Sequence, residues 1–343
     1  METITSFTSE LHMGYQINML TVGDINAASS RLRCFFLGES LKAMGVDVSY
    51  NTFDENEDLL IVQKNISTRI FEYAQSVKKK GGYVLYDIDD EGEGMAWLRI
   101  DPHLRSRFLS ICDILTVNTQ HRFSLLDRDP DLNRIPCKFV RPDPIDYLPW
   151  APIGGSFNMK GLPPKGCWFG NSINLSVALP YIDVLLEANV LHSFDAITSG
   201  AVLEKLFLSY PRIGYKKWDL QRFATTLKHY DFCVLIHDDT AEGNKKSNNK
   251  MMAALALGVV PLVSQTVAYA ETAHAIGIPE LIVSNPKELA AKIVQPGFLE
   301  TMNHKIRLPE CQSYLKEFSS EKIADQFAQQ LLKFTTAQAE TAH

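Results

Sequence analysis

Residues 230–264, YDFCVLIHDDTAEGNKKSNNKMMAALALGVVPLVS, decide how this chain folds. A short apolar run at 232–236 is followed by a polar loop, by the apolar run MMAALALG that ends at Gly258, and by a second apolar run at 259–263. This order predicts a strand, a helix that ends at a glycine, and a second strand, which together make a βαβ unit. Units of this kind build parallel sheets that helices cover on both faces.

The same alternation of strands and helices extends over most of the chain. Predicted strands lie at 15–22, 46–50, 59–63, 83–88, 114–118, 138–141, 166–169, 194–198, 232–236 and 259–263. Predicted helices lie at 31–44, 66–80, 104–112, 179–188 and 219–228, at the stretch that ends at Gly258, and at 310–334, which is long and amphipathic. Both halves of the chain therefore predict the α/β class with doubly wound parallel sheets.

A proline-rich segment separates the two halves. Residues 142–165 contain six prolines and a pair of glycines, with almost no hydrophobic periodicity, which is typical of a linker between domains. We therefore predict an N-terminal domain at 1–145, a linker at 146–165, a C-terminal domain at 166–310 and a terminal helical region at 311–343. Ligands of such folds bind beyond the carboxyl ends of the strands, so we expect a site in a cleft between the domains.

The composition excludes several classes of protein. Of the 343 residues, 45% are hydrophobic and 22% are charged, as in ordinary globular proteins. The net charge of −6 gives no overall signal for nucleic acid or for an anionic membrane. The six cysteines form no CxxC pair or Cys/His cluster, which argues against a zinc site and a disulfide framework. Neither a signal peptide nor an apolar run of about 20 residues is present, so we predict a reduced, soluble, cytoplasmic protein.

The loop before the helix that ends at Gly258 is rich in lysine. Lys245, Lys246 and Lys250 crowd where the helix begins, and Ser247 is predicted to cap it. Helix N-termini carry partial positive charge, so each cation there costs about 0.3 kcal/mol or more. A bound phosphate reverses that sign, because the ammonium groups and the helix dipole all attract it. The sequence favours an anion site here; the alternative is three exposed, solvated lysines.

Polar residues also follow the first predicted strand. The candidates in this loop are Ser29, Ser30, Arg31 and Arg33. Hydroxyls, helix N-terminal amides and guanidinium groups at a strand-to-helix turn suit an anion. Alternatively, a serine caps the helix and the arginines are solvated or pair with Glu39 or Asp24. The loop lacks the GxGxxG pattern and the chain has no GxxxxGK[ST] loop, so nicotinamide and P-loop chemistry are both disfavoured.

A cluster of carboxylates follows the predicted strand at 83–88. The segment YDIDDEGE at 86–93 contains Asp87, Asp89 and Asp90 close to the strand end. Carboxylates at the carboxyl edge of a parallel sheet suit sugar hydroxyls, deprotonation of an acceptor, or a metal. The alternative is a polar turn that caps the next helix. Asp87 is the candidate nearest to the strand end.

The second half offers two weaker signals at strand ends. Gly170 and Asn171 follow the strand at 166–169, where a glycine allows close backbone approach and an amide can bind a ligand. The alternative is an ordinary turn. His237 follows the strand at 232–236 and is a candidate ligand contact, although a lone histidine at a strand end often has a structural role.

In this order and spacing, these segments resemble glycosyltransferases of the GT-B fold, in the branch related to glycosyltransferase families 4 and 1. The resemblance covers most of the chain. Its parts are SSRLR at 29–33, YDIDD at 86–90, CDILTVN at 112–118, WFGN at 168–171, HYDFCVL at 229–235, and KSNNK followed by ALG and PLVS at 246–264.

The resemblance implies two Rossmann-like domains that face each other across a cleft. It also implies a nucleotide-diphosphate-sugar donor on the C-terminal domain, an acceptor on the N-terminal domain, and a terminal helix that crosses back to the N-terminal domain. Basic groups would neutralise the departing diphosphate without a metal or another cofactor. Lys246, Ser247, Asn249 and Lys250 match the family's basic loop, and Gly170 with Asn171 matches its phosphate-side turn.

We therefore predict a glycosyltransferase that acts on a nucleotide-diphosphate sugar and an acceptor hydroxyl of a glycan, a lipid-linked glycan or another molecule. Nucleic acid is not an expected partner, and peripheral membrane contact is left open. The predicted catalytic residues are Lys246, Lys250, Arg31 and Asp87. The predicted binding residues are Ser29, Ser30, Arg33, Asp89, Asp90, Gly170, Asn171, His237, Glu242, Asn244, Lys245, Ser247, Asn248 and Asn249.

The chain departs from the family at two acids. Retaining members carry Glu-x7-Glu in this region, and alignment on Gly258 places Lys245 and Ala253 at those positions, with Glu242 three residues out of register. A glycine-rich loop after the first strand is also missing. Retention of configuration is the expected outcome. Two alternatives stay open, a nucleotide-sugar epimerase and a non-catalytic GT-B subunit that binds a glycan or partners an active transferase.

Overall fold

The computed structural model describes residues 15–54, 56–89, 101–146, 163–198 and 210–341. Asp90 and residues 147–162 of the predicted linker lie outside these ranges. The chain forms two compact units, an N-terminal unit of residues 1–144 and 317–343 and a C-terminal unit of residues 145–316. None of the helices in the described ranges combines the length and apolar character that a bilayer crossing requires.

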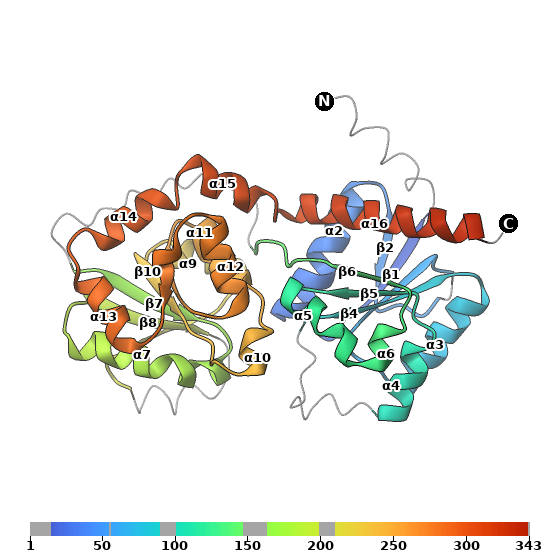
Figure 1. The fold of residues 1–343 in the computed structure, drawn as a ribbon, viewed down its shortest axis with the longest axis horizontal. Helices are drawn as coiled ribbons and strands as arrows, with labels where there is room; N and C mark the ends of the chain where they lie inside the picture. The colour runs from blue at the N-terminus through green and yellow to red at the C-terminus, as the bar shows by residue number, and fades with distance from the viewer. Residues whose placement is uncertain (1–14, 55, 90–100, 147–162, 199–209, 342–343) are drawn as a thin grey trace. The chain divides into compact units, whose positions relative to one another are not determined.

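The N-terminal unit contains a six-stranded parallel sheet (Figure 1). Its strands are β1 (Gln16–Leu20), β2 (Asp47–Tyr50), β3 (Leu59–Gln63), β4 (Tyr83–Ile88), β5 (Ile114–Val117) and β6 (Cys137–Val140). They lie in the order β2-β1-β3-β4-β5-β6. The chain moves from β1 to one side and from β3 onward to the other, so the topological switch point lies between β1 and β3.

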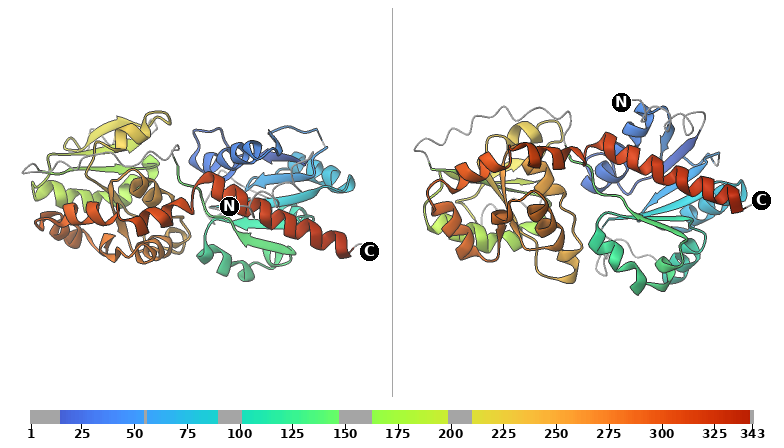
Figure 2. Two further views of the ribbon diagram at one scale, coloured as in Figure 1. Left: turned by 90° about the horizontal axis from the view of Figure 1, so that it is seen from above. Right: turned by 45° about the horizontal axis from the view of Figure 1, so that its top comes forward.

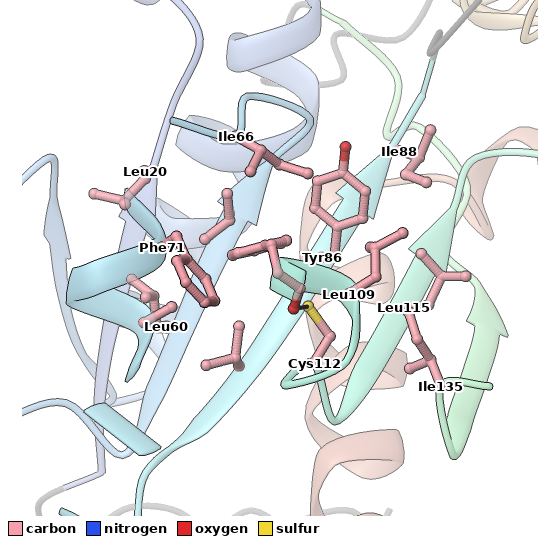
Figure 3. Packing of buried hydrophobic residues seen from close by; sticks show 14 of the residues in the cluster. Leu20, Leu60, Ile66, Phe71, Tyr86, Ile88, Leu109, Cys112, Leu115 and Ile135 are labelled. Atoms are coloured by element: carbon pink, nitrogen blue, oxygen red, sulfur yellow. Dashed lines mark hydrogen bonds between the residues drawn. The ribbon is translucent and has the colours of Figure 1, made fainter. Parts of the chain in front are cut away.

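Alternate residues of the central strands face two different helical layers. Leu60 and Val62 of β3 belong to a core that includes residues of α3 (Thr68–Lys79) and α4 (Pro102–Leu109), and Figure 3 shows this core. Leu59 and Ile61 belong to a second core on the opposite face, with residues of α2 (Phe36–Ala43) and α16 (Ser320–Thr341). This period of two explains why these strands are apolar throughout.

The end of the chain returns to the N-terminal unit. The sequence predicts one helix at 310–334, whereas the structure has α15 (Pro309–Lys316) and α16. The prediction missed the break because Ser319 starts a new helix: its hydroxyl accepts from the Lys322 amide at 3.2 Å. Ala324, Phe327 and Leu331 of α16 then pack in the core of the N-terminal unit.

The C-terminal unit contains a second six-stranded parallel sheet. Its strands are β7 (Lys165–Phe169), β8 (Ser193–Thr198), β9 (Gly214–Lys217), β10 (Phe232–Leu235), β11 (Val260–Ser264) and β12 (Ile282–Val283). The order β12-β11-β10-β7-β8-β9 is that of a Rossmann sheet, with the switch point between β7 and β10. The edge strands β9 and β12 were not predicted, because one is mostly polar (GYKK) and the other has only two residues.

Helices cover the second sheet on both sides (Figures 1 and 2). The longer ones are α7 (Leu175–Glu187), α11 (Asn249–Ala256), α12 (Val267–Ala275), α13 (Pro286–Val294) and α14 (Phe298–Lys305). The shorter helical segments of the two units are α1 (Ala28–Ser30), η1 (Arg31–Phe35), α5 (Gln120–Ser124), η2 (Leu126–Arg128), α6 (Pro130–Asn133), η3 (Ser172–Asn174), α9 (Phe223–Leu227), α10 (Ala241–Asn244) and η4 (Pro279–Leu281). The predicted α/β class with two doubly wound parallel sheets is confirmed.

Candidate functional site

The switch point of the C-terminal unit brings several predicted residues together. Gly170 follows β7, and its φ of 155° belongs to a region that side chains rarely adopt. A Cβ atom added to Gly170 would lie 3.4 Å from the Nζ atom of Lys250 and 3.2 Å from Trp168. The ammonium group of Lys250, at the start of α11, therefore lies beside the turn after β7. The glycine leaves room for this approach.

Lys250 and Lys246 form a pair of cations to which the described residues supply no carboxylate partner. Burial and the nearby charge of Lys246 lower the pKa of Lys250 to about 8. Within the described ranges, no carboxylate lies within ion-pair distance of either lysine, whereas Lys245 next to them has such a partner. Two neighbouring cations in a partly buried place repel each other, and a bound anion removes that repulsion.

Lys245 and Glu242 contact each other in place of a ligand. Their side chains form an ion pair of 2.6 Å across one turn of α10. This pairing satisfies the ammonium group of Lys245 and leaves Lys246 and Lys250 as the two cations that are available. The prediction that Lys245 and Glu242 bind substrate therefore has no support in the geometry.

Two asparagines of the same loop fasten it to α12. The Oδ1 atom of Asn244 accepts from the Val267 amide at 3.3 Å, and the Nδ2 atom of Asn248 donates to the Thr272 hydroxyl at 2.7 Å. Asn248 stands at the N-cap position of α11, so the prediction that Ser247 caps this helix is wrong by one residue. Both asparagines position the loop, since these bonds use their side chains. Asn249 is the first residue of α11.

His237 lies close enough to Lys246 and Lys250 for their charges to affect its protonation. Its pKa is lowered to about 2, first by burial and then by the charges of Lys250 and Lys246. The imidazole is therefore neutral at physiological pH. It stacks on Tyr269 of α12 with 5.3 Å between ring centroids, and its Nε2 atom lies 3.1 Å from the Tyr269 hydroxyl.

Asn171 has a partly local role. Its Oδ1 atom accepts from the Ile173 amide at 3.2 Å and so caps the short helix η3. The cap fixes the turn between Gly170 and α7. The Nδ2 group of Asn171 is exposed with the rest of the residue. Together with Lys246, Lys250 and His237, this turn makes a basic site, which we call the lysine site, at the carboxyl edge of the second sheet.

At the switch point of the N-terminal unit, polar side chains form hydrogen bonds with one another and with nearby backbone amides. Gln63 at the end of β3 accepts from the Val22 amide and from the Ser30 hydroxyl, both at 3.0 Å, and donates to the Ser29 hydroxyl at 2.6 Å. Ser30 in turn accepts from the Gly23 amide at 2.9 Å. The two serines therefore hold the β1–α1 loop against β3, and Ser30 is fully buried.

Arg33 and Asp87 are buried partners of each other. The carboxylate of Asp87 contacts Arg33, Arg141 and Thr116, and it is 0% exposed. Burial alone would raise the pKa of Asp87, but the charges of Arg141 and Arg33 outweigh it and hold this pKa well below its usual range. Arg33 also contacts Asp143 at 3.1 Å. Asp87, predicted for catalysis, and Arg33, predicted for binding, are therefore buried and paired inside this unit, and their functional roles stay predictions.

Arg31 forms hydrogen bonds within its own loop. Its guanidinium donates to the carbonyl oxygens of Ile25 and Asn26 at 3.0 and 3.2 Å, and the residue is 2% exposed. These two hydrogen bonds stabilise the β1–α1 loop, and the role of Arg31 at a diphosphate stays a prediction. Of the alternative partners that the sequence suggests for the two arginines, Glu39 pairs with Lys42, and Arg33 pairs with Asp87 and Asp143.

Of the two predicted acids at this edge that the structure describes, Asp89 is the more exposed. It is 8% exposed, accepts from the Ser29 hydroxyl, and pairs with Lys64 at 2.8 Å. Burial raises its pKa, but the charge of Lys64 and the hydrogen bonds from Lys64 and Ser29 lower it further than burial raises it. Lys64 adopts a φ of 38°, which is rare outside glycine and is typical of functional or over-determined positions.

Four residues that shape the two edges were not predicted. They are Gln63, Lys64, Arg141 and Tyr269. Gln63 and Lys64 directly follow an apolar strand run, so the rule that strand ends carry function would have found them. Arg141 follows β6 and would have been found by the same rule, whereas Tyr269 has no local signal, since its partner His237 lies 32 residues away in the sequence. Within the described ranges, no three His, Cys, Asp or Glu residues gather as a metal site would require.

Comparison with known proteins supports the fold. No family model and no curated protein matches the sequence. A sucrose-phosphate synthase from Thermosynechococcus elongatus superposes with a TM-score of 0.66 at 14% identity, over 94% of this chain and 100% of that one. A glycosyltransferase from Rickettsia africae ESF-5 gives 0.64 at 9% identity, over 94% and 99%. An alpha-glucosyltransferase in complex with UDP-glucose and DNA containing an abasic site gives 0.62 at 10%, over 94% and 100%. The predicted GT-B fold is therefore confirmed.

Proposed function

We propose that this protein is a glycosyltransferase that uses a nucleotide-diphosphate sugar and holds the diphosphate at its lysine site. One observation carries the proposal: Lys250 lies beside Gly170 at the switch point and close to the charge of Lys246, and neither lysine has a carboxylate partner in the described part of the chain. Evolved folds rarely keep two adjacent cations unbalanced in a partly buried place. The GT-B fold of the neighbours agrees with such a donor.

In the proposed reaction the bond between the anomeric carbon and the diphosphate oxygen breaks, and the acceptor oxygen bonds to that carbon. The leaving diphosphate gains negative charge, which the ammonium groups of Lys246 and Lys250 stabilise as preorganised cations. The proton of the acceptor hydroxyl passes to an oxygen of the departing diphosphate. Asp89, kept ionised by Lys64, is the acid that we propose for orienting the acceptor hydroxyl, because Asp87 is sealed between two arginines. Neither a metal nor another cofactor is needed in this scheme.

The finer features of the proposal rest on the family resemblance. We propose retention of configuration at the anomeric carbon, an acceptor hydroxyl on a glycan, a lipid-linked glycan or another small molecule, and action in the cytoplasm. One neighbour was crystallised with DNA. The net charge of −6 on the present chain offers no comparable attraction for nucleic acid, so we do not propose it as an acceptor.

The first experiment is a thermal-shift panel with UDP-, GDP-, dTDP- and CMP-sugars on the wild type and on Lys246→Ala. We expect one nucleotide to raise the Tm of the wild type, and Lys246→Ala to abolish that shift. Lys245→Ala is the matched control, because Lys245 is a neighbouring lysine with its own partner, and it should keep the shift. Retained affinity in Lys246→Ala would contradict the assignment of the lysine site.

Turnover then separates transfer from the alternatives. Slow hydrolysis of one donor without acceptor is the result expected of a transferase, whereas conversion of the donor to a sugar isomer would indicate an epimerase. Ala253, at the position of the family's second acid, is 2% exposed in α11, so ribose must be held by other residues. Binding without any turnover across an acceptor library would overturn the enzymatic part of the proposal.

A further inference from the structure

Tyr269 is a buried phenol with one hydrogen-bond partner in the described residues. Its side chain is 0% exposed, and its hydroxyl lies 3.1 Å from the Nε2 atom of His237. A phenol carries one proton to donate. If Nε2 of His237 carried a proton and donated to Tyr269, the phenol proton would point at no acceptor. Buried polar hydrogens are almost always paired, so the phenol donates and Nε2 accepts.

We infer that Tyr269 holds His237 in the neutral tautomer with its proton on Nδ1, so that His237 offers an uncharged hydrogen-bond donor to a diphosphate oxygen at the lysine site. Tyr269 acts here as a positioning residue and His237 as a binding residue. The inference rests on the proposed function, since it assigns a role within that same site.

The position of the His237 ring is fixed on three sides. Its backbone amide donates to the Ser264 hydroxyl at 2.9 Å, its ring stacks on Tyr269, and its Nε2 atom is held by the phenol. Nδ1 is the polar atom of the ring that has no protein partner in the described ranges. A donor that is held in place before the ligand arrives loses little rotational freedom on binding.

A neutral donor suits a site that already contains two cations. A protonated imidazole would add a third positive charge beside Lys246 and Lys250, and both lysines act against that charge. A neutral imidazole with a fixed tautomer can still donate a hydrogen bond to a negatively charged oxygen. Other enzymes use a neutral histidine in this way at the reaction centre. The arrangement therefore adds a directed hydrogen bond without raising the repulsion within the site.

The first arm of the test reads the tautomer without a ligand. Long-range nitrogen–proton NMR of the histidine-labelled full chain distinguishes Nδ1–H, Nε2–H and the imidazolium, and the His237 signals are identified by their loss in His237→Asn. We expect Nδ1–H between about pH 6 and 8. An Nε2–H ring or an imidazolium would overturn the inference. Tyr269→Phe removes only the hydroxyl and should give a mixture of tautomers.

Tyr230→Phe is the matched control for Tyr269→Phe. Tyr230 is also a buried tyrosine of this unit, but its hydroxyl donates to Asp195 and it precedes β10, whereas His237 follows that strand. Loss of its hydroxyl should reduce the Tm and leave the His237 tautomer unchanged. An equal tautomer shift in both variants would show that general loosening of the unit, and not the Tyr269 hydroxyl, moves the proton.

The second arm measures binding of UDP, GDP and dTDP by calorimetry. Asparagine places an amide N–H where Nδ1 lies, and glutamine places one where Nε2 lies. We expect His237→Asn to keep the affinity within about threefold and His237→Gln to lose about tenfold or more, as for one charge-assisted hydrogen bond. Equal affinities in the two variants would overturn the assigned contact. If the wild type binds none of these nucleotides, the proposed function fails, while the NMR arm still decides the tautomer.

Discussion

The two sheets differ in how the charged side chains at the carboxyl ends of their strands are paired. In the N-terminal unit, Arg33 and Arg141 contact Asp87, and Lys64 contacts Asp89, so each of these cations has a carboxylate. In the C-terminal unit, Lys246 and Lys250 have none among the residues that the structure describes. Both edges belong to six-stranded parallel sheets, so the difference comes from the side chains and not from the topology.

This difference separates stability from binding. Buried charges that are paired within the chain hold loops and strands in place. Removal of one partner leaves the other charge buried and uncompensated, which lowers the free energy of unfolding. Charges that are left unpaired at a switch point cost stability until an anion arrives, and this is the behaviour of a binding site. The charge balance of an edge therefore predicts whether a substitution there reduces folding stability or ligand affinity.

The largest expected effect is on stability in the N-terminal unit. Asp87→Asn should lower the free energy of unfolding by about 3–5 kcal/mol, because it leaves two buried guanidinium groups around a neutral amide. Urea denaturation measures the change. Glu39→Gln is the control, since Glu39 forms an exposed pair with Lys42 and its loss should cost less than about 1 kcal/mol. A loss that is no larger for Asp87→Asn than for the control would contradict the structural role of this cluster.

The fold could be predicted because its signals are local. All ten predicted strands are present, with ends within two residues, since apolar runs of four to six residues bounded by turns mark buried strands. The missed elements lack that signal: β9 is polar and lies at an edge, and β12 has two residues. The break between α15 and α16 depends on a single serine cap inside one amphipathic pattern.

The site could be predicted only in part, because charge balance is a long-range property. The cluster of lysines in residues 242–250 is visible in the sequence, but the pairing of Lys245 with Glu242 selects which cations remain available. Asp87 and Arg33 have a spacing of 54 residues, so no local pattern reveals that they cancel each other. The rule that functional residues lie at strand ends identified both edges. It did not show that the charges are paired at one edge and unpaired at the other.

The same substitution at both edges tests the comparison directly. Lys250→Gln should weaken nucleoside-diphosphate binding by about 10- to 100-fold, the worth of one charge-assisted contact, with little or no loss of stability. Lys64→Gln should instead lower stability by about 2 kcal/mol or more and leave nucleotide affinity unchanged, because it strands the buried carboxylate of Asp89. Calorimetry and urea denaturation measure the two properties. The comparison fails if both variants lose the same property.

A smaller effect concerns pH. Lys250 has a pKa of about 8 without ligand, and an anion raises it, so binding takes up a proton near pH 8. Affinity for a nucleoside diphosphate should therefore fall about fivefold from pH 8 to pH 9. His237 stays neutral throughout this range, since its pKa is lowered to about 2. Without ligand the sign is opposite: the unfolded chain binds more protons above pH 8, so the stability contribution of Lys250 rises with pH.

Calorimetry in two buffers of different ionisation enthalpy measures the proton uptake. We expect about half a proton at pH 8 in the wild type and none from this group in Lys250→Gln. Proton release in the wild type, or the same uptake in Lys250→Gln, would show that another group titrates on binding.

The smallest expected effect comes from a methyl group beside the lysine site. In Gly170→Ala the new Cβ would lie 3.2 Å from the Trp168 ring, so the ring or the turn must shift by a few tenths of an ångström, right beside the Nζ atom of Lys250, which lies 3.4 Å from the same Cβ. We expect nucleotide affinity to fall about three- to fivefold, well below the effect of Lys250→Gln.

Gly277→Ala is the control. Gly277 also has a positive φ, of 70°, but nothing lies within 4 Å of its added Cβ. Both variants should lose about 1 kcal/mol of stability to backbone strain, and only Gly170→Ala should bind nucleotide more weakly. Equal affinities in the two variants would mean that the position of Lys250 does not depend on the turn after β7.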